Sequence, residues 1–233
     1  MELETEVIIE PDYRGFKAPG AVLIEGLPGV GLVAKTAVAY MLEKLGGRRV
    51  CRLYSPYFPT MGYVREGRLV PSFADIYHVE AERPLLLLYG NAQPSSYYGQ
   101  HEFCEKILDV VTGFGADFIL TLGGYGKDKV SEQRAVYLSS TNPKTLEKAL
   151  EVLDAEAYEG QIIGAAGLLI TLAEEQGIDN LSMLIEAGES TPDFQAAKRA
   201  VESVAKFLGL RLRVEGLYSI SETYNSAYKR LEV

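Results

Sequence analysis

Apolar residues follow two patterns that alternate along the chain. Short continuous runs, typical of strands buried on both faces of a sheet, occupy residues 21–25, 49–54, 85–89, 117–122 and 181–186. Apolar residues with the helical spacing of three and four positions recur over residues 32–45, 97–114, 142–153, 164–176 and 191–208. This alternation predicts an α/β fold with three layers, a mostly parallel central sheet with helices on both faces.

One stretch departs from this alternation. Residues 63–70 alternate between apolar and polar side chains and turn at Glu66-Gly67, which indicates a hairpin. Residues 73–80 continue with strand-like alternation. We therefore expect a single domain over residues 1–233, with a β-rich insert at about 55–80 that forms a flap or an added edge of the sheet, and a C-terminal helix at about 214–231.

Charge and composition narrow the class of protein. The net charge of −9 argues against a general nucleic-acid binder, which needs a basic face. The acidic start is unlike a signal peptide, and the longest apolar stretch, residues 162–173, is well short of the ~20 residues that span a bilayer. The two cysteines, Cys51 and Cys104, are typical of reduced thiols. We expect a cytoplasmic protein with no nucleic-acid or membrane partner.

A glycine-rich turn follows the first long apolar strand. Residues 29–34 fit G-x-G-x-x-G/A, the turn at which a helix N-terminus meets a pyrophosphate. However, no acidic residue ends the strand at residues 49–54 to hold a ribose, and no Lys follows Gly31 to hold a phosphate. We therefore favour a structural role for the glycines and predict no cofactor. The structural glycine-loop signature consists of Gly26, Pro28, Gly29, Gly31, Gly123 and Gly124.

The predicted strand ends, where open α/β sheets bind ligands, carry few side chains suited to catalysis. No G-x-S-x-G nucleophile motif occurs. Glu25 lies inside an apolar strand, where we favour a hydrogen-bonded structural acid over an acid or base with a raised pKa, and Glu186 receives the same interpretation. His101 and Cys104 have the spacing of half a metal site, but the chain has two histidines and no second cluster. We predict no catalytic residue and no metal ligand.

Tyrosine is unusually frequent, with 15 Tyr and no Trp. Tyrosine is enriched at protein–protein interfaces, but it also serves as a half-buried anchor of loops. The sequence leaves both interpretations open. Those predicted in loops or near strand ends are Tyr54, Tyr57, Tyr63, Tyr97, Tyr98 and Tyr125.

Taken together, the motifs resemble the proteasome assembly chaperone family, archaeal branch. The opening signature is residues 24–34, and the resemblance extends over roughly residues 5–210. Each motif is weak by itself, but their order and spacing are fairly specific. The further matching segments are residues 57–59, 90–94, 121–125, 160–169 and 186–189.

The resemblance implies an α/β fold similar to nucleoside phosphorylases, without their catalytic residues. It also implies a non-enzymatic, ATP-independent chaperone that binds proteasome α-subunits, promotes core-particle assembly and self-associates into a homo-oligomer, from trimer to pentamer. Some members dock through a C-terminal hydrophobic-Tyr-any tripeptide. Here Glu232 replaces that Tyr, so Leu231 and Val233 either make a weaker tail contact or simply end a helix.

A second class of function stays open at this point. The glycine loops at shared strand ends are compatible with an α/β enzyme or sensor that binds a nucleotide or a nucleoside. The sequence names no residue that such a site would use for chemistry. We therefore expect the assembly chaperone and retain the small-molecule site as the alternative.

Overall fold

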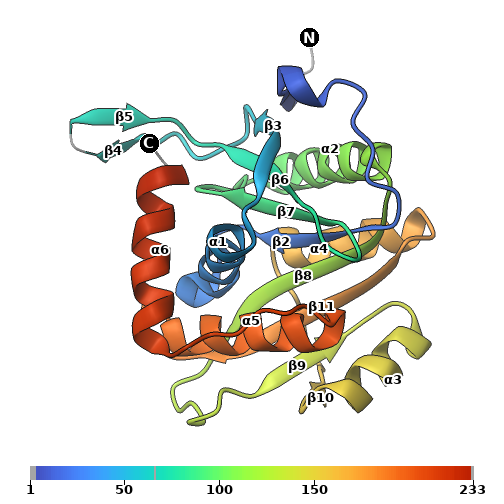
Figure 1. Cartoon of the computed structure of the whole chain (residues 1–233), viewed down its shortest axis with the longest axis vertical. Helices are drawn as coiled ribbons and strands as arrows, with labels where there is room; N and C mark the ends of the chain where they lie inside the picture. Colours follow the sequence, from blue (N-terminus) through green and yellow to red (C-terminus); the bar gives the residue numbers. More distant parts are fainter. Residues whose placement is uncertain (1–3, 66, 232–233) are drawn as a thin grey trace.

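The computed structural model describes residues 4–65 and 67–231 and confirms the predicted fold class, an α/β sandwich with helices on both faces of a large sheet (Figure 1). Among these residues, nine strands form one sheet in the order β1-β3-β6-β7-β2-β8-β11-β9-β10. Their bounds are β1 Glu6–Ile9, β2 Ala21–Gly26, β3 Arg48–Tyr54, β6 Ala74–Val79, β7 Leu85–Gly90, β8 Ala116–Gly126, β9 Val136–Ser139, β10 Glu156–Ala157 and β11 Asp179–Ala187.

The centre of the sheet is parallel, and its flanks are mixed. Strands β7, β2, β8 and β11 are parallel neighbours, and every residue of β2 and β7 is buried, as expected for strands covered on both faces. On one side β6, β3 and β1 follow in antiparallel pairs, and on the other side β9 pairs antiparallel with β11.

The predicted insert divides between two places. The hairpin of β4 (Tyr63–Arg65) and β5 (Arg68–Val70) forms a separate two-stranded sheet that projects from the body (Figure 1). In contrast, β6 lies inside the main sheet between β3 and β7, and is neither a flap nor an edge. A buried strand must satisfy its backbone N–H and C=O groups, and the two antiparallel neighbours of β6 provide these partners.

The helices cover the two faces unequally. On one face, α1, α5 and α6 pack together over the sheet and α3 lies beside them, while α2 and α4 cover the other face (Figure 1). No helix of the described residues is long and apolar enough to cross a membrane. The α-helices are α1 Val33–Leu45, α2 Tyr97–Phe114, α3 Pro143–Val152, α4 Ala165–Glu175, α5 Phe194–Leu208 and α6 Leu217–Leu231, and two short 3₁₀ helices are η1 Pro11–Tyr13 and η2 Val30–Leu32.

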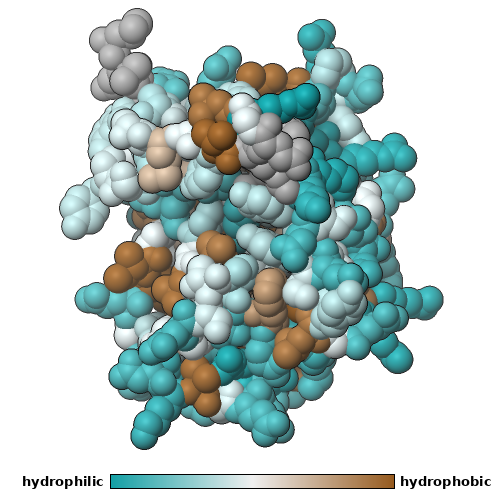
Figure 2. Space-filling model, turned by 90° about the vertical axis from the view of Figure 1, so that its left-hand side faces the viewer, coloured by the Kyte–Doolittle hydropathy of each residue, from teal (hydrophilic) through white to brown (hydrophobic). Residues whose placement is uncertain are grey.

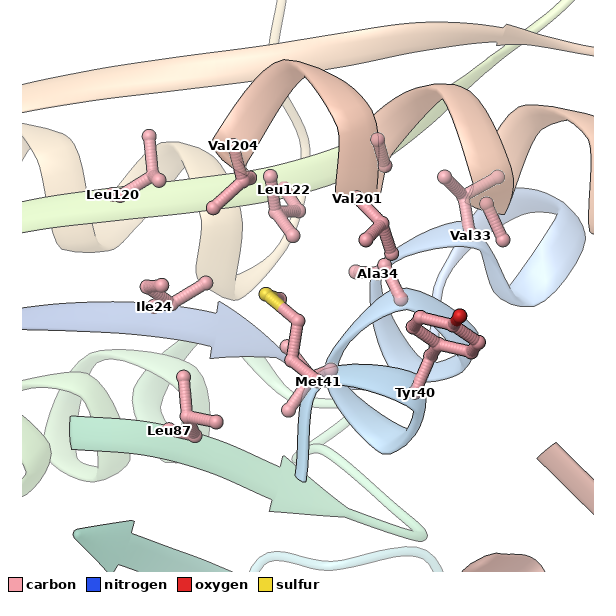
Figure 3. Close-up of a cluster of buried hydrophobic side chains, with 14 of the residues drawn as sticks. Ile24, Val33, Ala34, Tyr40, Met41, Leu87, Leu120, Leu122, Val201 and Val204 are labelled. Atoms are coloured by element: carbon pink, nitrogen blue, oxygen red, sulfur yellow. The ribbon is translucent and has the colours of Figure 1, made fainter. Parts of the chain in front are cut away.

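Figure 3 shows the core between the sheet and the α1–α5 layer. Ile24 and Leu120 on neighbouring strands face Met41 of α1, and Val201 and Val204 of α5 close the cluster. Each of these side chains is completely buried, and burying an aliphatic side chain of this size stabilises the fold by about 1.5–3 kcal/mol. This core holds α1 against β2, which fixes the position of the glycine turn that joins them.

Candidate functional site

The first glycine turn joins β2 to α1, and two of its positions require glycine for different structural reasons. A Cβ on Gly26 would lie 2.4 Å from Cβ of Val38, so Gly26 permits close packing of β2 against α1. Gly31 has a φ of +59° and is followed by Leu32 with a φ of +49°. The chain therefore enters α1 through two left-handed residues, and a side chain at Gly31 would be strained.

The start of α1 is covered by the protein itself. The carbonyl of Gly31 accepts a hydrogen bond from the amide of Asp193, with 2.9 Å between the heavy atoms. Asp193 is buried, forms an ion pair with Arg134, and accepts bonds from the amides of Gly188 and Ala196. A bound pyrophosphate needs an accessible helix N-terminus, but Val33 and Ala34, the first residues of α1, are buried, which favours the structural interpretation of the turn.

The second glycine loop, at the end of β8, packs directly on the first. A Cβ on Gly124 would lie 2.3 Å from the carbonyl oxygen of Val30, and a Cβ on Gly123 would lie 2.7 Å from Leu184. The two loops approach each other this closely because Gly124 has no side chain at its contact with Val30. The signature glycines therefore form one structural unit at the carboxyl ends of the parallel strands.

A cavity of about 270 Å³ lies beside this unit, at the carboxyl ends of β2 and β8 and under the start of α4. Its position is where ligands bind in open α/β sheets. Gln93 holds its wall together: Nε2 donates to the carbonyl of Pro28 (2.6 Å), and Oε1 accepts from Gln100 (2.9 Å) and from the amide of Ala165 (3.2 Å). The residues that line the cavity are Glu25, Leu27, Pro28, Gly29, Val30, Ala34, Gln93, Leu122, Gly123, Gly124, Tyr125, Gly126, Tyr158, Gln161, Ile162, Ile163, Ala165, Ala166 and Leu184.

Glu25 is the carboxyl group of this cavity. It is 2% exposed, and Oε1 accepts a hydrogen bond from the amide of Leu27 at 2.7 Å. Its other oxygen, Oε2, has no hydrogen-bond partner among the described residues. Burial raises the pKa of Glu25 to about 7, although the nearby backbone amides of Leu27 and Leu122 oppose the shift. Glu25 therefore combines the two interpretations: it braces the turn through one oxygen and has a raised pKa in a cleft.

Glu186, at the end of β11, has the opposite electrostatics. Its carboxylate accepts bonds from the amide (2.8 Å) and hydroxyl (2.5 Å) of Ser131 and from the amide of Ala135 (3.2 Å), and Lys127 lies 3.4 Å away. Burial acts to raise the pKa of Glu186, but these hydrogen bonds outweigh it and lower the pKa to about 2. Glu186 is thus a structural acid that fixes the loop of residues 127–135.

The lining of the cavity does not suit a phosphate. Among the described residues that line it, none is Lys, Arg or His, and nucleotide sites normally place cationic groups or an open helix N-terminus on the phosphates. Glu25 would also repel an anion. The geometry therefore argues against the nucleotide form of the alternative function, while the cavity, which lies at the strand ends where the sequence left a small-molecule site open, stays available to another class of ligand.

The histidines and cysteines lie apart from this cavity. On α2, Nδ1 of His101 and Oε1 of Glu105 are exposed and lie 3.2 Å apart, whereas Cys104, one turn along, is fully buried. No group of three potential metal ligands occurs among the described residues. His78 is half-buried against the ring of Phe16, with 4.9 Å between the ring centroids.

The structure shows tyrosines as loop anchors, one of the two interpretations that the sequence left open, and the interface interpretation stays a prediction. Tyr125, Tyr137 and Tyr158 form an edge-to-face cluster beside the cavity, and the ammonium of Lys127 lies 5.0 Å from the Tyr137 ring centroid. Such rings anchor loops. At the start of α2, by contrast, Tyr97 is 98% exposed.

The predicted partner-binding tail begins at a docked helix. Leu231, the last residue of α6, is 7% exposed and belongs to the core cluster on the α1 face of the sheet, and Arg230 forms an ion pair with Glu43 of α1 at 2.7 Å. Glu232 and Val233 lie outside the described residues, so their predicted role is untested. Figure 2 shows the side of the molecule that carries α6 and the β4–β5 hairpin, where hydrophobic patches are separated by hydrophilic residues.

Comparison with known proteins identifies the family to which this chain belongs. A model of the PAC2 family matches residues 23–232. A protein of Methanocaldococcus jannaschii, described as uncharacterised, is 32% identical over 200 residues, which cover 84% of this chain and 77% of that protein. The crystal structure of Pyrococcus furiosus PbaB, an archaeal proteasome activator, superposes with a TM-score of 0.84 at 28% identity and covers 99% of this chain and 98% of PbaB.

A second solved structure has the same fold. Pyrococcus furiosus PbaA, an archaeal homolog of proteasome-assembly chaperone, superposes with a TM-score of 0.76 at 24% identity and covers 98% of this chain and 96% of PbaA. The resemblance to archaeal proteasome assembly chaperones that the motifs predicted is thereby confirmed. Since the family model spans the region from β2 to the end of α6, this chain belongs to the PAC2 family.

Proposed function

We propose that this protein is a non-enzymatic, ATP-independent chaperone that binds proteasome α-subunits and promotes assembly of the core particle. The observation that carries the proposal is the match of the PAC2 family model to residues 23–232. The nearly complete superposition on PbaB, at 28% identity, supports a contact with the proteasome. The proposal also includes self-association, from trimer to pentamer, and a cytoplasmic location.

The strand ends support the non-enzymatic part of the proposal. Glu25 and Glu186 are the buried acids there, and each is tied to backbone amides of a neighbouring loop. Among the described residues that line the cavity there is no Ser, Cys or His that could act as a nucleophile beside a base. The side chains thus lack the nucleophile–base arrangement that covalent catalysis requires.

A second function, activation of an assembled proteasome, is favoured by one specific observation. PbaB, an activator, superposes with a TM-score of 0.84 and 28% identity, whereas PbaA, the assembly-chaperone homolog, gives 0.76 and 24%. Both functions share a contact with the proteasome, so they differ in which form of it is bound. A test must therefore present separate α-subunits and assembled core particles side by side.

Reconstitution separates these two functions. Purified protein is added without nucleotide to α-subunits alone, to α- and β-subunits together, and to mature core particles. A chaperone is expected to bind α-subunits and to increase the rate of core-particle formation on native gels. Faster peptide hydrolysis by mature particles, with no effect on assembly, would instead establish the activator. No association in any mixture and at any salt concentration would refute both.

The tail can be tested without damaging the fold. Deleting residues 229–233 would also remove Leu231 from the core and Arg230 from its ion pair with Glu43. Deletion of residues 232–233 removes only the segment beyond α6. Its matched control is Arg230→Ala, which weakens an exposed ion pair but keeps the tail. If the tail docks, binding to α-subunits falls in the deletion and persists in the control; equal binding in both would assign the contact to another surface.

A further inference from the structure

Three buried side chains with unsatisfied oxygens lie in one row below α4. Glu25 of β2 is paired in register with Thr121 of β8, which is paired with Ser182 of β11. All three are at most 2% exposed, and Oε2 of Glu25, Oγ1 of Thr121 and Oγ of Ser182 have no hydrogen-bond partner among the described residues. A buried polar atom without a partner costs about 1–3 kcal/mol, so a row of them needs an explanation.

Glu25, at one end of this row, also lines the cavity. Apart from that carboxyl, most side chains around it are apolar, as at Leu27, Leu122, Leu184 and Ile162. The rim is also apolar: Val30 is 51% exposed and Ile163 is 87% exposed. An apolar cavity with a small number of convergent polar groups is the usual composition of a small-molecule site.

The volume and charge of the cavity define the class of ligand. At about 270 Å³ it lies just below the range typical of drug-sized ligand pockets, about 300–1,000 Å³, so a molecule of one or two rings fits. Glu25, the sole charged group of the described lining, disfavours anionic ligands when it is ionised and favours groups that carry hydrogen-bond donors.

We propose that this cavity binds a small, largely apolar molecule with an N–H donor, an amine or an amide, which donates a hydrogen bond to Oε2 of Glu25. The body of the ligand lies between Leu27 and Leu184, and its polar end reaches the floor between β2 and β8. This function is independent of proteasome binding and is not needed for it.

The protonation state of Glu25 distinguishes the two kinds of ligand. Because its pKa is about 7, the carboxyl changes charge near neutral pH. A protonated amine binds the carboxylate and lowers the pKa of Glu25, since an opposite charge favours the ionised form. A neutral amide pairs with the carboxyl group without a charge requirement, so its binding changes little with pH.

Four single-ring probes test the proposal on the intact, methyl-labelled protein: benzylamine, benzamide, methyl benzoate and benzoate. Binding is followed by the NMR methyl signals of Leu27, Leu122 and Leu184, and the charge of Glu25 by the ¹³C shift of its carboxyl carbon. Benzylamine and benzamide are expected to shift the methyl signals in a saturable manner at millimolar concentration. Methyl benzoate, which has no N–H donor, and benzoate, an anion, are expected to bind at least about tenfold more weakly.

Variants connect the binding to the site. Glu25→Gln is expected to weaken the binding of benzylamine at least about tenfold and that of benzamide by a smaller factor, because the glutamine keeps an acceptor oxygen but not the charge. Ala166→Leu, which fills the half-buried wall of the cavity, is expected to weaken both. Asp117→Asn, at the opposite end of β8, is the control and should change neither.

Any of three results would overturn the proposal. The first is that no probe shifts these methyl signals, the second is that methyl benzoate binds as tightly as benzylamine and benzamide, and the third is that benzylamine binds the Glu25→Gln variant as tightly as the wild type. Spectra of each variant without probe confirm that it is folded. Because the assay measures ligand binding by the isolated protein, its failure would leave the proteasome proposal intact, and a failed reconstitution would leave this one intact.

Discussion

Glu25 folds back onto the turn that follows it, so that its Oε1 accepts a hydrogen bond from the amide of Leu27 at 2.7 Å. This contact joins the end of β2 to the first glycine loop and leaves Oε2 at the cavity without a partner among the described residues. Glu186, at the end of β11, instead receives several hydrogen bonds from the loop at Ser131 and Ala135. Two buried strand-end acids thus have opposite pKa shifts, and this contrast can be measured.

Glu25→Gln should make stability less dependent on pH between about pH 4 and pH 8. The pKa of Glu25 is raised from 4.5 to about 7 in the folded protein. As the pH rises, the unfolded chain therefore releases this proton at a lower pH than the folded protein does. The wild type loses stability as the pH rises through that interval. The glutamine has no proton to lose. Relative to the wild type, the variant should gain up to about 3 kcal/mol at pH 8. Urea unfolding at several pH values measures the difference, and a constant offset between the two proteins would contradict the prediction.

Glu186→Gln should show the opposite sign. The pKa of Glu186 is lowered to about 2, so its contribution to stability is fully present above the ordinary value of 4.5 and is lost as pH falls toward 2. The substitution should therefore lower the free energy of unfolding by about 2–3 kcal/mol at neutral pH and by less in acid. The same unfolding series checks this result, and the opposite slopes of the two variants serve as mutual controls.

Three alanine substitutions should separate the roles of the glycine loops. Gly31→Ala places a side chain at a φ of +59° and should cost ~1 kcal/mol. Gly29 has an extended backbone, with φ −153° and ψ −161°, and open space where a Cβ would stand, so Gly29→Ala should change stability by less than about 0.5 kcal/mol. Gly124→Ala meets the backbone of Val30 and should cost about 2 kcal/mol or more.

Chemical denaturation of the three variants gives the order of these costs. Equal destabilisation by Gly29→Ala and Gly31→Ala would show that the positive φ of Gly31 is not the reason why the turn requires glycine. A neutral Gly124→Ala would show that the two loops can move apart.

Asp75→Ala should be one of the most destabilising changes in the sheet. Asp75 is completely buried on β6 and accepts bonds from Nε (2.6 Å) and Nη2 (2.7 Å) of Arg52 and from the hydroxyl of Tyr77 (3.2 Å). Removing one partner of a buried ion pair costs about 3–5 kcal/mol. The matched control is Asp117→Ala, whose ion pair with Arg83 is exposed and should contribute about 0–1 kcal/mol. Thermal unfolding compares the two, and similar losses would refute a special role of the buried pair.

Neither cysteine should react in the folded protein. Cys51 and Cys104 are completely buried, and burial raises the pKa of both thiols, that of Cys51 to about 12. Because the thiolate is the reactive form, a chromogenic disulfide reagent at about pH 8 should label the native protein at least about a hundredfold more slowly than the urea-unfolded protein. Rapid labelling without denaturant would reveal local opening of β3 or α2.

Sequence patterns predicted the central strands and most helices because those elements carry a strong local signal. The mostly apolar runs of β2, β7, β8 and β11 indicate burial on both faces, and Asn142 before Pro143 marks the start of α3. The position of β6 carried no such signal. Alternation at residues 73–80 is the same for an edge strand and for an inner antiparallel strand, and only its pairing with both β3 and β7 places it inside the sheet.

For the candidate site too, some properties followed from the sequence and others only from the tertiary structure. The sequence by itself determined that the glycine turn lacks the acidic and basic residues of a dinucleotide site, and that Glu25 and Glu186 are unusual acids at strand ends. The tertiary structure decided what these residues do, because a pKa depends on burial and on hydrogen bonds from distant segments. Ser131 lowers the pKa of Glu186 from 55 positions away, and the shape of the cavity beside Glu25 depends on α4 and Gln93, which meet only in the folded chain.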